Sequence, residues 1–278
     1  MARYGMIIDV DRCTGCYACF LSCRDEHSGN DHRPVALAQP EGQSWIKVSE
    51  REQGSFPKVK VSYVPVPCLH CADAPCMTAA TGGAVYRRED GIVLIDPDKA
   101  AGQRGIASAC PYGAIFWNEE RNSPQKCSFC AHLLDEGWKE PRCVEACPTL
   151  ALVFGDLDNP DSEVSRLRAA KPVEELLPQL ATRPLVSYRS LPARFVSGEI
   201  VLGDRKDECA EGVTVVLRHG RQTLTTATDN YGDFEFRDLD ADGEFVLSIE
   251  HAGYKPRELT ARAAADFNLG TIVLEAAA

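Results

Sequence analysis

The spacing of the cysteines is the feature that most constrains what this chain can fold into. Four of its 13 cysteines, Cys13, Cys16, Cys19 and Cys23, form a C-x2-C-x2-C-x3-C run. In a run of this kind the first three thiolates bind one [4Fe–4S] cluster, and the fourth binds a different cluster. A zinc site instead favours two separated C-x2-C pairs around a tetrahedral ion. The run therefore predicts iron–sulfur chemistry.

Two further cysteine groups vary the same pattern. The spacing is x2 and x4 in the first group, and x2, x12 and x3 in the second. Either group alone is compatible with zinc, but beside the first run both favour further clusters. The two groups are Cys68, Cys71 and Cys76, and Cys127, Cys130, Cys143 and Cys147.

A fourth run has kept only its closing cysteine. The segment MIIDVDRCTGC (6–16) is repeated as VLIDPDKAAGQ (93–103), with aspartates, a basic residue and a glycine in register. In that register Cys110, which precedes a proline, takes the place of Cys23. Three ligand positions of this run and the closing position of the Cys68 group lack cysteine; they are Ala100, Gln103, Ile106 and Ala80.

These losses indicate how the runs pair. If each cluster takes three ligands from one run and the fourth from a partner run, the four lost ligands would have held one cluster together. Twelve cysteines then complete three [4Fe–4S] sites, and only Cys209 is left over. The predicted sets are Cys13, Cys16, Cys19 and Cys147 (set 1), Cys127, Cys130, Cys143 and Cys23 (set 2), and Cys68, Cys71, Cys76 and Cys110 (set 3).

The fourth site is predicted to be vacant and filled by protein. An empty space of cluster size is costly in a packed interior, so Ile106 and its apolar neighbours are expected to occupy it. The Gln103 amide should bond to backbone or water, since a buried unpaired amide is unfavourable. The predicted lining is Ala80, Ala100, Gln103 and Ile106.

Charge and hydropathy exclude several classes of protein. The net charge of −11 and the absence of a basic run argue against a nucleic-acid surface. No apolar run approaches a membrane span, and the N-terminal segment lacks a basic region followed by a long apolar stretch. We therefore expect a cytoplasmic protein, in which clustered thiols bind metal rather than form disulfides.

Two features have simple structural interpretations. The stretch RDEH (24–27) is expected to be a solvated face. His70, between two predicted ligands, is more simply a packed or exposed side chain than a group that tunes a cluster by hydrogen bonding.

The pattern of elements predicts an α+β fold with a nested, pseudo-twofold cluster domain over residues 1–155. It is nested because the Cys68–Cys110 unit lies inside the Cys13–Cys147 unit. Residues 156–194 read as a linking or wrapping segment, and residues 195–278 as an antiparallel β-sandwich of short alternating strands. The strands expected in the cluster domain are 4–9, 84–88 paired with 91–96, 114–118 and 150–155.

The cysteine runs resemble those of the bacterial-ferredoxin-like iron–sulfur subunits of molybdenum or tungsten pterin oxidoreductases, over about residues 1–155. EDGIVLIDP, QKCSFCAHLLD and the appended sandwich are similar to the small subunits of the group that includes pyrogallol–phloroglucinol transhydroxylase and anaerobic resorcinol hydroxylase. TDNYGDFEF and HAGY resemble prealbumin-like, carboxypeptidase-regulatory domains. The resemblance implies a large partner subunit with a molybdenum bis-(molybdopterin guanine dinucleotide) site, where hydroxylated aromatics react, and no catalytic residue in this chain.

Two functions from different classes follow from these observations. The favoured one is the electron-transfer subunit of a two-subunit molybdenum enzyme, because three clusters need a redox partner and the chain has no substrate-binding signature. The alternative is a stand-alone polyferredoxin that shuttles electrons, with the sandwich as an adaptor. A stable complex with a molybdenum protein would distinguish the first from the second.

Overall fold

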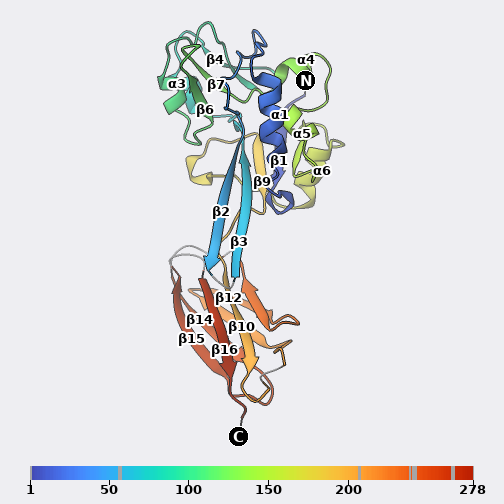
Figure 1. The fold of residues 1–278 in the computed structure, drawn as a ribbon, viewed down its shortest axis with the longest axis vertical. Coiled ribbons are helices and arrows are strands. Elements are labelled where there is room, and N and C mark those ends of the chain that lie inside the picture. The colour runs from blue at the N-terminus through green and yellow to red at the C-terminus, as the bar shows by residue number, and fades with distance from the viewer. Residues whose placement is uncertain are drawn as a thin grey trace. The chain divides into compact units, whose positions relative to one another are not determined.

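The computed structural model of this chain separates into two compact units, each with its own hydrophobic core (Figure 1). The first unit comprises Met1–Glu50 and Ser62–Leu191, and the second comprises Arg51–Val61 and Pro192–Ala278. Within the described parts of the chain, no helix is long and apolar enough to cross a membrane. The structure describes residues 2–55, 58–205, 208–237, 239, 243–263 and 267–277.

A three-stranded sheet organises the first unit (Figure 1). Its central strand β1 (Tyr4–Asp9) pairs antiparallel with β8 (Leu152–Asp156) and parallel with β9 (Val186–Arg189). Helix α6 (Glu163–Ala170) packs on β1 and β8. The segment that follows Cys147 thus completes the sheet through β9 and covers it through α6.

Strand β1 is apolar because both of its faces are buried. Successive side chains of a strand point to opposite faces. Ile7 packs with Val153 and Val164 of α6 on one face, whereas Met6 and Ile8 belong to the large core on the other. This large core is the one that contains most of the cysteines.

Three two-stranded sheets supply the other strands described in the first unit, and the residues of one pair, β2 and β3, are divided between the two units. The strands predicted at 4–9, 84–88, 91–96, 114–118 and 150–155 are confirmed, with boundaries that differ by at most two residues. The paired strands are β2 (Lys47–Ser55) with β3 (Lys58–Val66), β4 (Val85–Arg87) with β5 (Val93–Ile95), and β6 (Ile115–Asn118) with β7 (Ser123–Lys126).

Short helices carry or adjoin the cysteines. All except the first are four or five residues long, about a single turn. Two 3-10 turns, η1 (Val10–Arg12) and η2 (Pro178–Leu180), accompany them. The helices are α1 (Ala18–His27), α2 (Pro75–Ala79), α3 (Gly105–Ser108), α4 (Ala131–Asp135) and α5 (Arg142–Glu145).

The second unit is a sandwich of two sheets, with strand orders β13-β10-β16 and β12-β11-β14-β15. Side chains such as Ile200, Leu217 and Leu247 from the two sheets share one core. The strands are β10 (Val196–Leu202), β11 (Thr214–His219), β12 (Gln222–Ala227), β13 (Asp233–Phe236), β14 (Gly243–Glu250), β15 (Arg257–Ala263) and β16 (Phe267–Leu274).

The expectation of a purely antiparallel sandwich is wrong for one pair of strands. Over the described residues, strands β10 and β16 run parallel, whereas the pairs β10–β13, β11–β12, β11–β14 and β14–β15 are antiparallel. Parallel neighbours need a long connection, and here five intervening strands provide it. The first and last strands of the sandwich, β10 and β16, can therefore run in the same direction side by side.

Candidate metal centres

The first set of thiols combines three cysteines from the N-terminal run with one that follows α5. Burial raises the pKa of Cys19 to about 12, and the charges of Cys13, Cys147 and Cys16 add to the effect. Burial also raises the pKa of Cys13, where Cys147 and Cys16 contribute in the same direction. Cys147 thus lies near a run more than a hundred residues before it. Cys19 and Cys147 are buried, whereas Cys16 is exposed.

The second set joins Cys23 on α1 to three cysteines around α4 and α5. Burial raises the pKa of Cys127 well above its usual value, followed by the charges of Cys23 and Cys130. Burial raises the pKa of Cys143 in the same way, and Cys130, Cys127 and Cys23 add to it. The side-chain amide of Gln39 donates a hydrogen bond of 3.5 Å to Cys23 Sγ.

The third set brings Cys110 to the Cys68 group. Burial raises the pKa of both Cys71 and Cys76 to about 11, and the charges of Cys68 and Cys110 add to the effect at each. Burial also raises the pKa of Cys110, and the charge of Cys68 adds to the effect. These four thiols come from the loop before α2, from α2 itself and from the turn after α3.

The three sets are neighbours in space. The charge of Cys19 in set 1 raises the pKa of Cys143 in set 2. The charge of Cys68 in set 3 likewise raises the pKa of Cys127 in set 2. Set 2 is therefore adjacent to both of the others. The remaining cysteine, Cys209, is exposed in the second unit.

All four runs share one backbone turn. The residue before the second ligand position has a positive φ in each run: 67° at Gly15, 46° at His70, 53° at Phe129 and 78° at Gly102. This left-handed region is unfavourable for residues with a side chain, so its use by a histidine and a phenylalanine reflects a constraint on the loop. Gly102 belongs to the run without its cysteines, which supports the internal repeat.

Backbone amides point at cysteine sulfurs in a repeated way. The first cysteine of a run accepts an N–H from the residue two positions on, and the cysteine before a proline accepts one from four positions on. Such bonds favour the charged thiolate that a metal requires. They run from His70 to Cys68 (3.5 Å), Phe129 to Cys127 (3.4 Å), Ala114 to Cys110 (3.4 Å) and Ala151 to Cys147 (3.3 Å).

Lys126 is a buried cation beside these thiols. Its side chain is only 4% exposed, and its ammonium donates to the carbonyl oxygens of Val93 and, at 3.1 Å, Cys127. No carboxylate pairs with it among the described residues. Its charge acts on Cys76 and Cys110, where it lowers the pKa against the larger effect of burial. A buried cation requires a compensating negative charge, which thiolate-ligated clusters would supply.

His70 carries a buried N–H donor that a bound group with acceptor atoms could satisfy. Its ring is fully buried and packs at a tilt against Phe129, with 3.8 Å between centroids. Its Nδ1 accepts the N–H of Val93 at 3.1 Å, so the ring proton sits on Nε2. This donor is buried and has no partner in the described chain. An acceptor atom of a bound group would satisfy it.

The run that lacks three cysteines is packed by its own side chains. Ala100 and Ile106 have no exposed surface, and Ala80 packs partly buried against the same core. The Gln103 side-chain oxygen accepts the backbone N–H of Thr81 at 2.9 Å. The prediction that this amide would bond to backbone is confirmed.

Comparison with known proteins identifies both units. Residues 59–157 match the 4Fe-4S dicluster domain family, and residues 196–275 match the carboxypeptidase regulatory-like domain family. The chain is 41% identical to the pyrogallol hydroxytransferase small subunit of Pelobacter acidigallici, over 91% of this chain and 92% of that one. It is 35% identical to a putative iron-sulfur subunit of dimethyl sulfoxide reductase from Halobacterium salinarum, over 68% and 79% of the two chains. The arsenate respiratory reductase iron-sulfur subunit ArrB of a Shewanella strain is 32% identical, over 67% and 95%.

A ferredoxin-like domain rich in closely spaced cysteines, followed by a β-sandwich domain, defines a class of iron–sulfur electron carriers. This chain belongs to the family of iron–sulfur electron-transfer subunits of molybdopterin oxidoreductases. In this family the small subunit accompanies a larger catalytic subunit, where the substrate reacts.

Proposed function

We propose that this chain conducts electrons through three [4Fe–4S] clusters to or from the molybdenum site of a large partner subunit. The observation that supports the proposal is that thiols of each predicted set lie close enough for their charges to shift one another's pKa values. Each cluster would accept or give up one electron at a time. The chain's own residues would fix the clusters, exclude water from them and set their potentials through amide hydrogen bonds and the charge of Lys126.

The proposed ligand sets are crossed between runs, and the cluster domain is a nested pseudo-twofold pair. The common left-handed turn at Gly15, His70, Gly102 and Phe129 supports this repeat. We assign residues 1–155 to the cluster domain, 156–194 to a segment that wraps it through α6 and β9, and 195–278 to the sandwich. The sets are Cys13, Cys16, Cys19 and Cys147; Cys127, Cys130, Cys143 and Cys23; and Cys68, Cys71, Cys76 and Cys110, with Ala80, Ala100, Gln103 and Ile106 lining a vacant fourth site.

The iron content should be about twelve atoms per chain, because three cubanes carry four irons each. Replacing Cys110 by serine should weaken the set 3 cluster alone and reduce iron towards eight. The matched control is Cys209→Ser, which removes the exposed cysteine outside the three sets and should leave twelve. Sixteen irons in the unchanged protein, or no loss in the Cys110 variant, would contradict the assignment. Iron analysis and electron paramagnetic resonance (EPR) spectra of the reduced protein give the answer.

The partner is proposed to act on hydroxylated aromatic compounds at a molybdenum bis-(molybdopterin guanine dinucleotide) site. The support is the likeness over 91% of this chain to a subunit named as a pyrogallol hydroxytransferase. The proposed assembly is a cytoplasmic heterodimer or a multiple of it. Set 1 is the proposed point of contact, because Cys16 is exposed and Leu150, three residues after Cys147, is 58% exposed.

Anaerobic purification of the tagged chain should recover a large molybdenum-containing subunit in a 1:1 ratio, with activity towards pyrogallol or a similar phenol. Leu150→Glu should weaken the complex at least tenfold without loss of iron, since a charge would replace an exposed apolar side chain at the contact. Leu180→Glu, at an exposed leucine on η2, is the control. Recovery of the chain alone, with all its clusters, would favour a free electron shuttle instead.

A further inference from the structure

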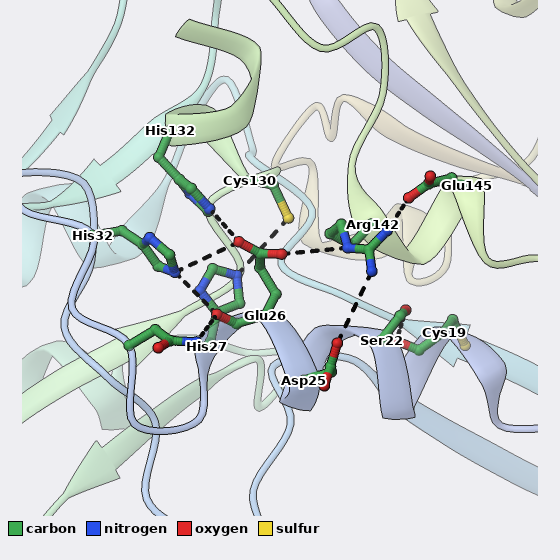
Figure 2. Close-up of polar contacts among 11 residues, drawn as sticks. Cys19, Ser22, Asp25, Glu26, His27, His32, Cys130, His132, Arg142 and Glu145 are labelled. Atoms are coloured by element: carbon green, nitrogen blue, oxygen red, sulfur yellow. Dashed lines mark hydrogen bonds and ion pairs between the residues drawn. The ribbon is translucent and has the colours of Figure 1, made fainter. Parts of the chain in front are cut away.

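Three histidines converge beside set 2 (Figure 2). His27 ends α1, His32 lies in the loop that follows, and His132 belongs to α4. One ring nitrogen from each lies within 4.8 Å of the others. Glu26 adds a carboxylate whose Oε1 is 2.9 Å from His132 Nε2 and 3.7 Å from His32 Nε2. Figure 2 shows the His32 and His132 rings turned towards this carboxylate, with His27 beside them.

The fold holds these rings in place. The His32 and His132 rings stack at 3.7 Å between centroids, and His27 meets both nearly edge-on at 5.2 and 5.3 Å. The loop is closed by a 2.8 Å bond from the Gln39 N–H to the His27 carbonyl and a 2.9 Å bond from the His32 N–H to the Ala36 carbonyl. Side chains from three segments are thus preorganised around one small volume.

Two ring nitrogens of the three histidines have no hydrogen-bond partner in the described chain. His27 is 2% exposed, and its Nε2 lies 3.8 Å from Cys130 Sγ. Its Nδ1 is buried and has no hydrogen-bond partner in the described chain, and the same holds for Nδ1 of His132. Orphaned ring nitrogens at nine-tenths burial or more are costly unless another group binds there.

The charged side chains near the three histidines carry a net negative charge. Arg142 is the guanidinium shared by three carboxylates: Glu26 at 3.3 Å, Asp25 at 4.0 Å and Glu145. One positive charge therefore faces three negative ones, as the dashed contacts in Figure 2 indicate. The thiolates of set 2 add further negative charge nearby, through Cys130. A cation at the histidines would offset this excess.

We propose that Glu26, His27, His32 and His132 bind one divalent transition-metal ion, with zinc as the expected ion, in a site separate from the iron–sulfur clusters. Imidazole nitrogens with one carboxylate are a ligand set that zinc favours. Zinc bonds of 2.0–2.1 Å place tetrahedral ligands about 3.3 Å apart. The distances of 2.9 and 3.7 Å from Glu26 Oε1 to His132 Nε2 and His32 Nε2 bracket this value, and the three histidine nitrogens, within 4.8 Å of one another, would move closer on binding. His32 Nε2, which lies 3.0 Å from the Glu26 carbonyl oxygen, would give up that contact to bind the ion. With four protein ligands the site is structural, and it ties the loop after α1 and helix α4 to the end of α1.

The first test is metal analysis of the complete, cluster-loaded complex purified anaerobically and dialysed against EDTA. The expected result is about one zinc per chain in addition to the iron. Zinc K-edge absorption should give nitrogen or oxygen neighbours at about 2.0 Å and no sulfur shell. The absence of stoichiometric zinc or another non-iron divalent metal overturns the proposal. A sulfur shell does so as well, because it would place zinc in a cysteine site.

The second test uses variants. His32→Ala and His132→Ala should reduce zinc from about one to near zero while iron is unchanged, and His251→Ala in the second unit should leave both metals as they are. Iron content reports whether each variant keeps its fold. If His132→Ala loses iron because it adjoins Cys130, the loop variant His32→Ala decides. Zinc retained in an iron-replete His32→Ala protein overturns the proposal.

Discussion

Replacing Cys147 by alanine should remove the cluster of set 1 and about four of twelve irons, although three of its ligands lie at positions 13 to 19. The reason is spatial. Cys147 is buried, and its charge acts on both Cys13 and Cys19. Without its fourth ligand the cluster would be held by three thiols, one of which, Cys16, is exposed to solvent and oxidants. These three thiols should therefore fail to retain the cluster, whereas the clusters of sets 2 and 3 should stay in place.

Matched variants identify which cluster is lost. Cys147→Ala and Cys16→Ala should leave the same reduced EPR spectrum, because both remove set 1. Cys130→Ala should leave a different spectrum, since it removes set 2. A Cys147 variant that matches the Cys130 variant would refute crossed ligation. Cys209→Ala serves as the control for removal of a cysteine as such.

The cluster runs could be predicted because their information is local. Ligand spacing, a following proline and alternating apolar residues are properties of a few consecutive residues, and the strands at 84–88 and 91–96 followed from them. The hydrogen bonds from the Gln103 side-chain amide to backbone groups were also predictable, because an amide without such partners is unfavourable. The repeat aligns Gly15 with Gly102, and in the structure both have a positive φ. At His70 and Phe129 the same turn gave no signal, because residues with side chains seldom adopt it.

Features that depend on distant partners could not be predicted in this way. The parallel pair β10–β16 joins the first and last strands of a unit, and no local pattern specifies the direction of such a pair. The stretch RDEH was expected to be solvated, yet His27 is buried: its ring packs on Trp45 at 4.4 Å between centroids. Residue 132, whose ring also meets His27, is more than a hundred positions away. No spacing rule connects these residues before the chain folds.

Replacing Lys126 by methionine should lower the reduction potential of the set 3 cluster by roughly 50–90 mV. Reduction adds a negative charge to a cluster, so a fixed cation nearby favours the reduced state. At an effective dielectric constant of about 20, unit charges about 8 to 15 Å apart interact by roughly 1–2 kcal/mol, which gives that range for one electron. Lys126 is 4% exposed and acts on the set 3 thiols Cys76 and Cys110, so solvent would screen little of this effect. A redox titration followed by EPR measures the shift.

Two controls separate charge from packing in this experiment. Lys126→Arg keeps the charge and should keep the potential within about 20 mV, a fraction of the Coulomb effect. Lys99→Met removes a cation whose side chain is 58% exposed and paired with Asp96, and should change little because water screens it. Methionine at 126 also leaves the carbonyls of Val93 and Cys127 without their donor, so some loss of stability is expected in any case. Equal potentials in the methionine variant and the unchanged protein, at full iron content, would mean that Lys126 serves only to satisfy those carbonyls.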